Sequence, residues 1–132
     1  MILDGKVAVV TGGTRGIGFE TVRQFLLNGA KVCLLGSRAE TVDKAIQTLK
    51  SENQDFRVIG FYPNLTSESE VAKTFESVKA EFGKIDILIN NAGISSSTPL
   101  VNFSEAEYDK IADINIKSVF ICSKVAVPYL KE

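Results

Sequence analysis

Short apolar runs alternate along the chain with segments in which apolar residues recur three and four positions apart. The runs are rich in Val, Ile and Leu, which is typical of strands buried on both faces. The spaced segments have the periodicity of helices with one buried face. Strands are therefore predicted at residues 6–11, 31–36, 57–62 and 85–90, and helices at residues 16–28, 39–50, 67–83, 104–114 and 116–130.

Several of the predicted helices carry start and stop signals. Ser67 with Glu70, and Ser104 with Glu107, have the spacing of a capping box. Gly83 follows the third helical segment and is expected to end it. Pro128 is expected to bend or end the last helix, because proline lacks the backbone N–H that a helix interior uses.

Apolar strands separated by helices predict an α/β fold with a doubly wound parallel sheet. The length of 132 residues suits one domain, residues 1–132, and no repeat or linker divides it. In such sheets ligands bind beyond the carboxyl ends of the strands. Segments that follow predicted strands are therefore the first places to look for function.

Composition narrows the function classes. The net charge of −1 lacks the basic footprint of a nucleic-acid-binding protein. No apolar stretch is long enough for a membrane span, and no secretory signal is recognisable at the N-terminus. Cys33 and Cys122 lie in separate apolar segments, so buried free thiols and a reducing cytoplasm are expected. The chain has no histidine and no clustered cysteine pair, which argues against a zinc site.

The sequence "TGGTRGIG" at residues 11–18 follows the first predicted strand and opens the first predicted helix. Unpaired amides and the dipole at a helix N-terminus favour a phosphate group. Gly12 permits a tight turn, Gly16 permits close approach of a pyrophosphate, and Gly18 permits close packing of helix and strand. The alternative is a tight strand-to-helix connection without a ligand.

Together with "NNAG" at residues 90–93, this turn resembles the short-chain dehydrogenase/reductase family over the whole chain. The resemblance implies a Rossmann-type fold, a strand order of 3-2-1-4 and a nicotinamide cofactor. It implies cofactor contacts by Gly12, Thr14, Arg15, Gly16, Ile17, Gly18, Ser37, Arg38, Asn64, Leu65, Asn91, Ala92 and Gly93.

The end of the second predicted strand bears on the choice of cofactor. An acidic residue there is typical of NAD, whereas a basic residue accommodates the 2′-phosphate of NADP. Gly36 occupies the acidic position, and Ser37 and Arg38 follow it. Arg15 is expected to reach the same phosphate, so NADP(H) is predicted. Two alternatives stay open: the arginines are solvated surface residues, or Glu40 reaches the ribose and the cofactor is NAD(H).

Asn64 stands where relatives often carry an Asp that binds the adenine amine, and the backbone of Leu65 is expected to assist. The amide oxygen of Asn64 accepts a hydrogen bond without charge. By the same resemblance, Asn91 contacts the cofactor, while small Ala92 and Gly93 let the backbone approach it. Both segments have a purely structural alternative as turns.

Asn115 lies between two helical stretches, where an asparagine competes for backbone hydrogen bonds and often marks a bend. The resemblance makes it the catalytic asparagine, whose backbone carbonyl holds a water molecule of the proton relay. A simple helix kink is the alternative. The serines of residues 95–97 are expected to belong to a substrate-side loop and not to the catalytic machinery.

The family's acid/base pair, a tyrosine with a lysine four residues later, does not occur in these 132 residues. The fourth strand is also expected at a sheet edge, where an uncovered apolar strand is an aggregation hazard. We therefore expect the chain to be the front part of a longer polypeptide and inactive by itself. A functional short form is the alternative.

The predicted function is an NADP-dependent oxidoreductase that interconverts a ketone or aldehyde and an alcohol. The motifs resemble both 3-oxoacyl-[acyl-carrier-protein] reductases and bacterial hydroxysteroid dehydrogenases, so the substrate stays open between these classes. The resemblance further implies a cytoplasmic homo-oligomer, a dimer or tetramer, at full length. The alternatives are a non-catalytic NADP(H)-binding regulatory module and an inactive fragment.

Overall fold

Four parallel strands form one sheet in a computed structural model that describes residues 1–132. The strand order is β3-β2-β1-β4, which confirms the predicted order 3-2-1-4. Val9 in the central strand pairs with Cys33 on one side and Leu88 on the other. The strands are β1 (Val7–Thr11), β2 (Lys31–Leu35), β3 (Val58–Phe61) and β4 (Ile87–Ile89).

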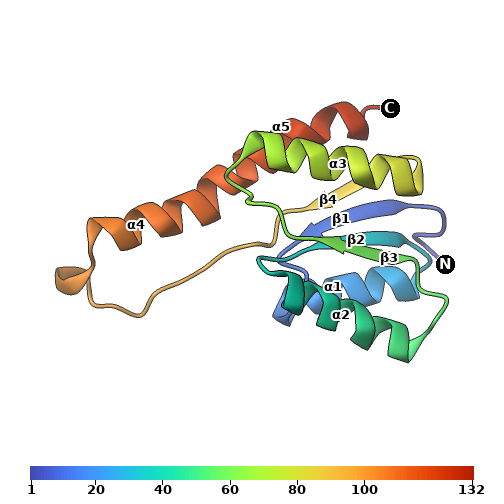
Figure 1. Cartoon of the computed structure of the whole chain (residues 1–132), viewed down its shortest axis with the longest axis horizontal. Coiled ribbons are helices and arrows are strands. Elements are labelled where there is room, and N and C mark those ends of the chain that lie inside the picture. The colour runs from blue at the N-terminus through green and yellow to red at the C-terminus, as the bar shows by residue number, and fades with distance from the viewer.

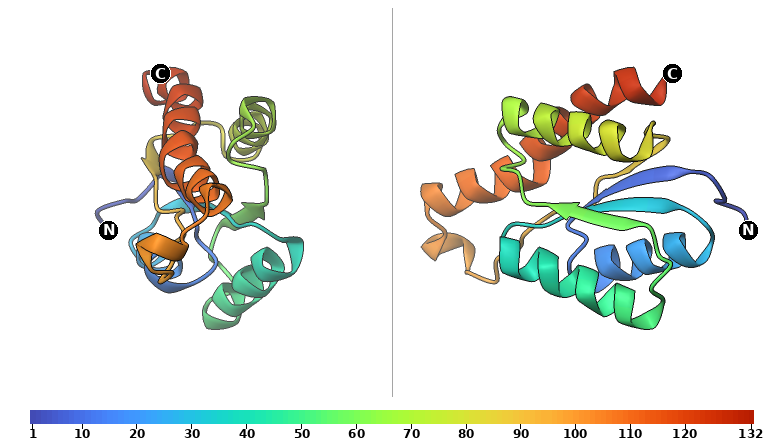
Figure 2. Two further views of the ribbon diagram at one scale, coloured as in Figure 1. Left: turned by 90° about the vertical axis from the view of Figure 1, so that its left-hand side faces the viewer. Right: turned by 45° about the vertical axis from the view of Figure 1, so that its right-hand side comes forward.

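Helices cover both faces of the sheet. In Figure 1, α1 and α2 lie below it, whereas α3 and α5 lie above it, and Figure 2 shows the same two layers from other sides. The shorter α4 projects away from the sheet together with the loop that leads into it. The helices are α1 (Gly16–Leu27), α2 (Ala39–Glu52), α3 (Glu68–Phe82), α4 (Glu105–Ala112) and α5 (Ser118–Leu130), with a short 3₁₀ turn at Leu100–Asn102.

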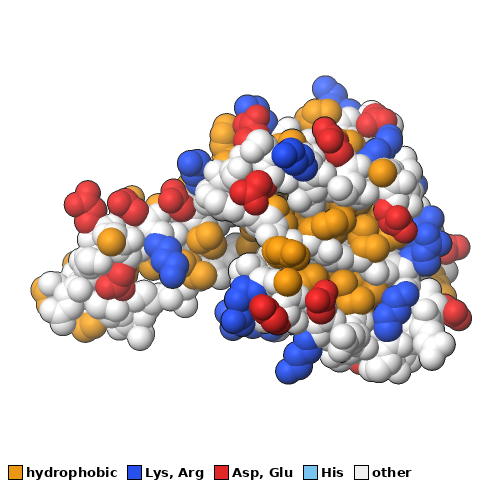
Figure 3. All heavy atoms as spheres, in the orientation of Figure 1, with side chains coloured by type: hydrophobic (Ala, Val, Ile, Leu, Met, Phe, Trp, Pro, Cys, Tyr) orange, Lys and Arg blue, Asp and Glu red, His pale blue; other side chains and the backbone are white.

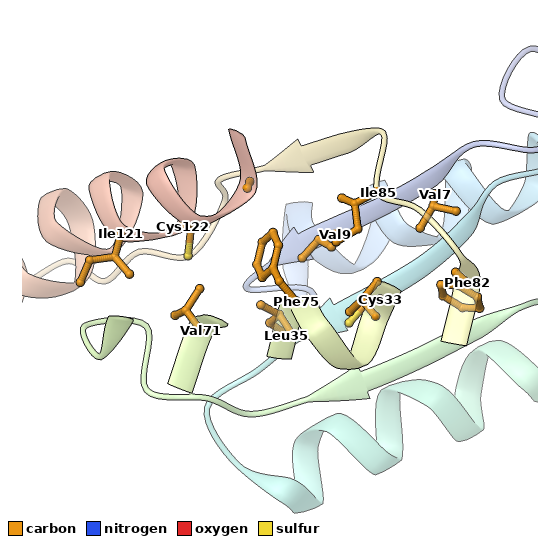
Figure 4. Packing of buried hydrophobic residues seen from close by; sticks show 12 residues of the cluster. Val7, Val9, Cys33, Leu35, Val71, Phe75, Phe82, Ile85, Ile121 and Cys122 are labelled. Carbon is orange, nitrogen blue, oxygen red and sulfur yellow. The ribbon is translucent and has the colours of Figure 1, made fainter. Parts of the chain in front are cut away.

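Each face of the sheet has its own hydrophobic core. Val7 and Val9 face the α3 and α5 side, where they pack with Phe75 and Cys122 (Figure 4). Val10 faces the opposite side and packs in the cluster between the sheet and α1 and α2. All five residues of β1 are buried, because side chains on both pleats of a central strand meet helices. The continuous apolar run of the sequence is thereby explained.

The predicted N-terminal caps are present. Ser67 accepts a hydrogen bond from the amide of Glu70, and Ser104 accepts one from the amide of Glu107. Gly83 ends α3 in the left-handed conformation, with φ of 86°. The glutamate side chains do not complete the capping box, since the Glu70 carboxylate accepts from the amide of Asn64 instead. This difference matters for the site described below.

One expectation about the last helices needs correction. α5 ends at Leu130, the predicted end, two residues after Pro128. The helices predicted at residues 104–114 and 116–130 are, however, not separated. A π-helical turn at Asp113–Lys117 joins α4 directly to α5.

Several apolar surfaces stay open. β4 pairs only with β1 and forms an edge of the sheet, as predicted. Ile116 and Phe120 are more than 60% exposed on the arm formed by the π-helical turn and α5. On the side of the β3 edge, hydrophobic side chains form a band between α2 and α3 (Figure 3). None of the helices combines the length and apolarity that crossing a membrane requires.

Candidate functional site

A cavity of about 760 Å³ runs across the carboxyl ends of the strands. The turns that follow all four strands contribute to its walls, which is where the fold predicts a ligand. Most of the residues singled out in the sequence therefore meet in one place. Those lining the cavity are Gly12, Thr14, Arg15, Gly16, Ile17, Ser37, Asn64, Leu65, Asn91, Ala92 and Gly93.

Gly18, Arg38 and Asn115 do not line the cavity, although each lies next to a residue that does. Gly18 is buried behind the glycine turn. Arg38 is exposed at the N-cap of α2. Asn115 lies in the π-helical turn, beside the lining residue Ile114. We place these three residues around the cavity and not in its wall.

The glycine turn presents backbone donors to the cavity. Gly12 and Gly16 have φ values of +64° and +58°, a region that residues with a Cβ rarely adopt. The amides of Gly16, Ile17 and Gly18 have no partner within the chain, as expected for the first turn of a helix. A Cβ added to Gly16 would meet no atom within 4 Å. The open space at Gly16, at the start of this helix, is suited to an anion.

Position 18 has no space for a side chain, and the reason is more than close packing of the helix on the strand. A Cβ at this position would lie 2.0 Å from the carbonyl oxygen of Gly12 and 2.4 Å from the side-chain nitrogen of Asn91. That nitrogen donates to the same oxygen at 3.0 Å. Glycine at position 18 thus leaves room for a hydrogen bond that ties the first βα turn to the end of β4.

Thr11 connects the same two turns and was missed in the sequence. Its buried hydroxyl oxygen accepts from the amides of Asn91 and Ala92, both at 2.9 Å. The hydroxyl also donates to the carbonyl of Ile89 at 3.4 Å. A hydroxyl at the last position of an apolar strand is the only signal that the sequence offered.

Asn115 is tied to the segment after β4. Its amide oxygen accepts from the amide of Ile94 and its amide nitrogen donates to the carbonyl of Ile94, both at 2.8 Å. The turn around it is π-helical, a conformation that is rare and frequent at functional sites. Ser118 closes the turn by donating to the carbonyl of Ile114. The asparagine marks a widened helical turn and not a plain kink.

Two cations lie near the end of β2 without acidic partners. Neither Arg15 nor Arg38 forms an ion pair, and both are exposed. Glu40 is exposed in the first turn of α2 and does not line the cavity. A smaller hollow of about 320 Å³ adjoins the cavity beyond Thr14 and Arg15. Its other lining residues are Phe19, Thr41, Lys44, Ala45 and Thr48.

The turn after β3 is organised by two side chains. The Asn64 oxygen accepts from both the amide and the hydroxyl of Thr66, at 3.0 and 2.7 Å. Glu70 in the first turn of α3 accepts from the amide of Asn64 at 3.1 Å and lines the cavity. Tyr62 also lines it and is 57% exposed. Neither Glu70 nor Tyr62 was expected at the site.

The thiols of Cys33 and Cys122 do not line the cavity. Both are free and buried in the core under α3 and α5. Burial raises the pKa of Cys33 far above its usual range and that of Cys122 to about 11. A thiol is a poor nucleophile when its thiolate is so disfavoured. No group of three or more potential metal-ligating side chains occurs.

Comparison with known proteins decides the family. A family model for short chain dehydrogenases matches residues 6–132. The chain belongs to the short-chain dehydrogenase family. It is 51% identical over 132 residues to a 3alpha-hydroxysteroid dehydrogenase of Mediterraneibacter gnavus, covering 100% of this chain and 53% of the relative. It is 33% identical over 130 residues to the 3-oxoacyl-[acyl-carrier-protein] reductase FabG of Thermotoga maritima, covering 98% and 52%.

Solved structures agree with this assignment. A short chain dehydrogenase from Mycobacterium smegmatis superposes with a TM-score of 0.89 at 30% identity, covering 96% of this chain and 53% of that one. The 3-ketoacyl-(acyl-carrier-protein) reductase of Brucella melitensis, complexed with NADH, gives a TM-score of 0.89 at 27% identity, covering 98% and 51%. This short-chain dehydrogenase chain spans about half the length of the curated relatives it matches.

Proposed function

We propose that the protein is an NADP-dependent oxidoreductase and that this chain is its cofactor-binding part. The observation that carries the proposal is the cavity across the carboxyl ends of β3, β2, β1 and β4, whose lining includes Gly16 and Ile17 with their unpaired amides. A dinucleotide crosses a doubly wound sheet at this place, with its pyrophosphate at the first helix. A bound nicotinamide dinucleotide supplies or accepts the hydride that interconverts an alcohol with a ketone or aldehyde.

The residues present fit such a group. The cavity of about 760 Å³ lies within the usual range for small-molecule and cofactor sites. Gly12 brings the first turn against Ala92, since a Cβ there would lie 2.9 Å from the Ala92 Cα. The turn after β1 and the turn after β4 therefore lie in backbone contact, and both contribute backbone to the cavity wall. Ala92 and Gly93 contribute no large side chain to the wall beyond β4.

NADP(H) is favoured over NAD(H) by charge. The adenosine ribose is bound at the end of the second strand in this type of fold. Here that end carries Gly36 and Ser37 in the cavity wall, with Arg38 next to them in the chain and Arg15 also lining the cavity. Neither arginine has an acidic partner, so both are available to a 2′-phosphate. Glu40, the residue that would favour NAD(H), lies outside the cavity wall.

Asn115 is proposed to act at the nicotinamide side. Its side chain is occupied by Ile94, which leaves the backbone of the π-helical turn to hold a water molecule of the proton relay. The 132 residues contain no Tyr-x-x-x-Lys sequence, so they do not supply the acid/base pair expected for this family. We therefore infer that the chain binds cofactor but does not turn over substrate by itself.

The substrate class follows only from relatives. A 3-oxoacyl thioester and a hydroxysteroid are both carbonyl or alcohol substrates, and proteins named for each match this chain over nearly its whole length. We propose a small-molecule substrate of one of these classes, and a cytoplasmic homo-oligomer for the full protein.

Titration of the protein with NADPH, NADH and adenosine 5′-monophosphate by calorimetry tests the proposal. NADPH is expected to bind most tightly, because it alone presents the 2′-phosphate. Competition with 2′,5′-ADP checks that the phosphate and not the nicotinamide causes the preference. Absence of heat with every dinucleotide would overturn the assignment, whereas equal affinity for NADPH and NADH would overturn only the choice of cofactor.

A further inference from the structure

Beyond β3, where the adenine of a dinucleotide would lie, the cavity wall has a free hydrogen-bond acceptor. That acceptor is not the side chain of Asn64. Asn64 lines this part of the cavity, but its oxygen is already engaged. It accepts from the amide of Thr66 at 3.0 Å and from its hydroxyl at 2.7 Å. A backbone amide only donates, so the atom facing it is the oxygen and not the nitrogen of Asn64. An amide oxygen has two lone pairs, and both are used in the turn.

Glu70 places a carboxylate in the same part of the cavity. One of its oxygens accepts a hydrogen bond from the Asn64 amide at 3.1 Å. This bond holds the Glu70 side chain against the turn after β3. The other oxygen has no partner in the chain. Glu70 lines the cavity together with Asn64 and Leu65. A fixed carboxylate with one free oxygen is suited to accept a hydrogen bond from a donor on the ligand.

Leu65 provides the complementary donor. Its backbone amide has no hydrogen-bond partner in the chain, and its side chain packs against the core cluster under α3 and α5. The free amide and the free carboxylate oxygen thus form a donor and an acceptor near each other in the cavity wall. The Watson–Crick edge of adenine carries the matching pair, an amino group that donates and a ring nitrogen that accepts.

We propose that Glu70 accepts a hydrogen bond from the adenine amino group, that the Leu65 amide donates to the adjacent ring nitrogen, and that Asn64 only shapes the turn. This inference rests on the proposed function, because it requires an adenine dinucleotide in the cavity. Glu70 is a specificity-determining residue in this account. It selects adenine against a base with a carbonyl oxygen at the same ring position.

The test compares NADPH with its hypoxanthine analogue, in which that amino group is replaced by a carbonyl oxygen and the adjacent ring nitrogen carries a hydrogen. The quantity measured is the ratio of the two dissociation constants in one protein sample, because a misfolded fraction cancels in the ratio. We expect the protein to prefer NADPH at least about tenfold, because the analogue loses the hydrogen bond to the charged Glu70 and sets a second donor against the Leu65 amide. Glu70→Gln keeps an oxygen for the Asn64 amide but replaces the free carboxylate oxygen by a donor. It is expected to reduce the preference at least tenfold.

Glu68→Gln is the matched control, since it removes the same charge from the same turn of α3 at a residue outside the cavity wall. It is expected to leave the preference unchanged. A preference that survives Glu70→Gln would overturn the role of Glu70 alone. Equal binding of both dinucleotides by the unmodified protein would do the same. Binding of neither would overturn the proposed function together with this inference.

Discussion

The side chain of Asn115 forms two hydrogen bonds with the backbone of Ile94, one to its amide and one to its carbonyl, each 2.8 Å long. The Asn115 side chain thereby satisfies both backbone polar groups of Ile94, as a neighbouring strand would. Gly93 is small enough for this approach, since a Cβ there would lie 3.3 Å from the Asn115 oxygen. The contact joins the π-helical turn to the wall of the cavity.

Asn115→Ala is expected to lower the free energy of unfolding by about 1–3 kcal/mol, because both hydrogen bonds are lost. Asn90→Ala is the control. Its side chain makes one hydrogen bond, to Ser123 at 3.2 Å, and not two at 2.8 Å, so a loss of no more than about 1 kcal/mol is expected. Urea denaturation followed by circular dichroism measures both variants. Equal losses would show that the pairing with Ile94 contributes nothing special.

Gly18→Ala is expected to be among the most destabilising single methyl additions in the chain. The new Cβ would lie 2.0 Å from the Gly12 oxygen, which belongs to the backbone and has little room to move. A loss of about 2–3 kcal/mol or more follows from overpacking combined with displacement of the Asn91 hydrogen bond.

The matched control is Gly83→Ala. Gly83 has φ of +86° and open space around it, so only the conformational cost of about 1–2 kcal/mol applies. Thermal unfolding of both variants separates the steric effect from the backbone effect. A Gly18→Ala variant as stable as the unmodified protein would contradict the described contact between the two turns.

Arg38→Asp is expected to weaken NADPH binding at least tenfold by removing a charge-assisted contact and adding repulsion. Binding of NADH is expected to change little, because it carries no 2′-phosphate. Lys131→Asp makes the same charge change at the far end of α5 and is expected to leave both affinities unaltered. If the NADPH preference persists in Arg38→Asp, the 2′-phosphate is bound without Arg38.

Asp86 is expected to make stability depend on pH in the acid range. Burial pushes the pKa of its carboxyl up, but the hydrogen bond from the Val7 amide, at 2.9 Å, and the nearby Lys84 and Lys6 outweigh this and lower the pKa. A lowered pKa in the folded state stabilises the protein above the unfolded pKa of about 3.9, and this contribution is lost as the pH falls through the folded value.

Asp86→Asn removes the titrating group and leaves the fold's other carboxyls in place. The stability difference between the unmodified protein and this variant is therefore expected to be greatest at neutral pH and to shrink below about pH 4. Denaturation at several pH values gives the difference directly. A difference that stays constant across the acid range would show that Asp86 does not titrate with folding.

The order of elements follows from the sequence because it depends on local patterns. Continuous apolar runs such as residues 7–10 indicate strands with two buried faces, and Gly83 and Ser67 mark helix ends by their own backbone preferences. The turn of Gly12 and Gly16 was recognisable for the same reason, since both residues adopt the positive φ for which glycine is suited.

Contacts between distant segments depend on the tertiary structure. Thr11 meets Asn91, 80 positions later, only because β1 and β4 lie side by side. Glu70 has the spacing of a helix cap in the sequence, yet its carboxylate turns to the loop after β3 and into the cavity. A local sequence pattern predicts which helix, strand or turn a residue belongs to. It does not predict which residue its side chain contacts, because that residue lies in a distant part of the chain.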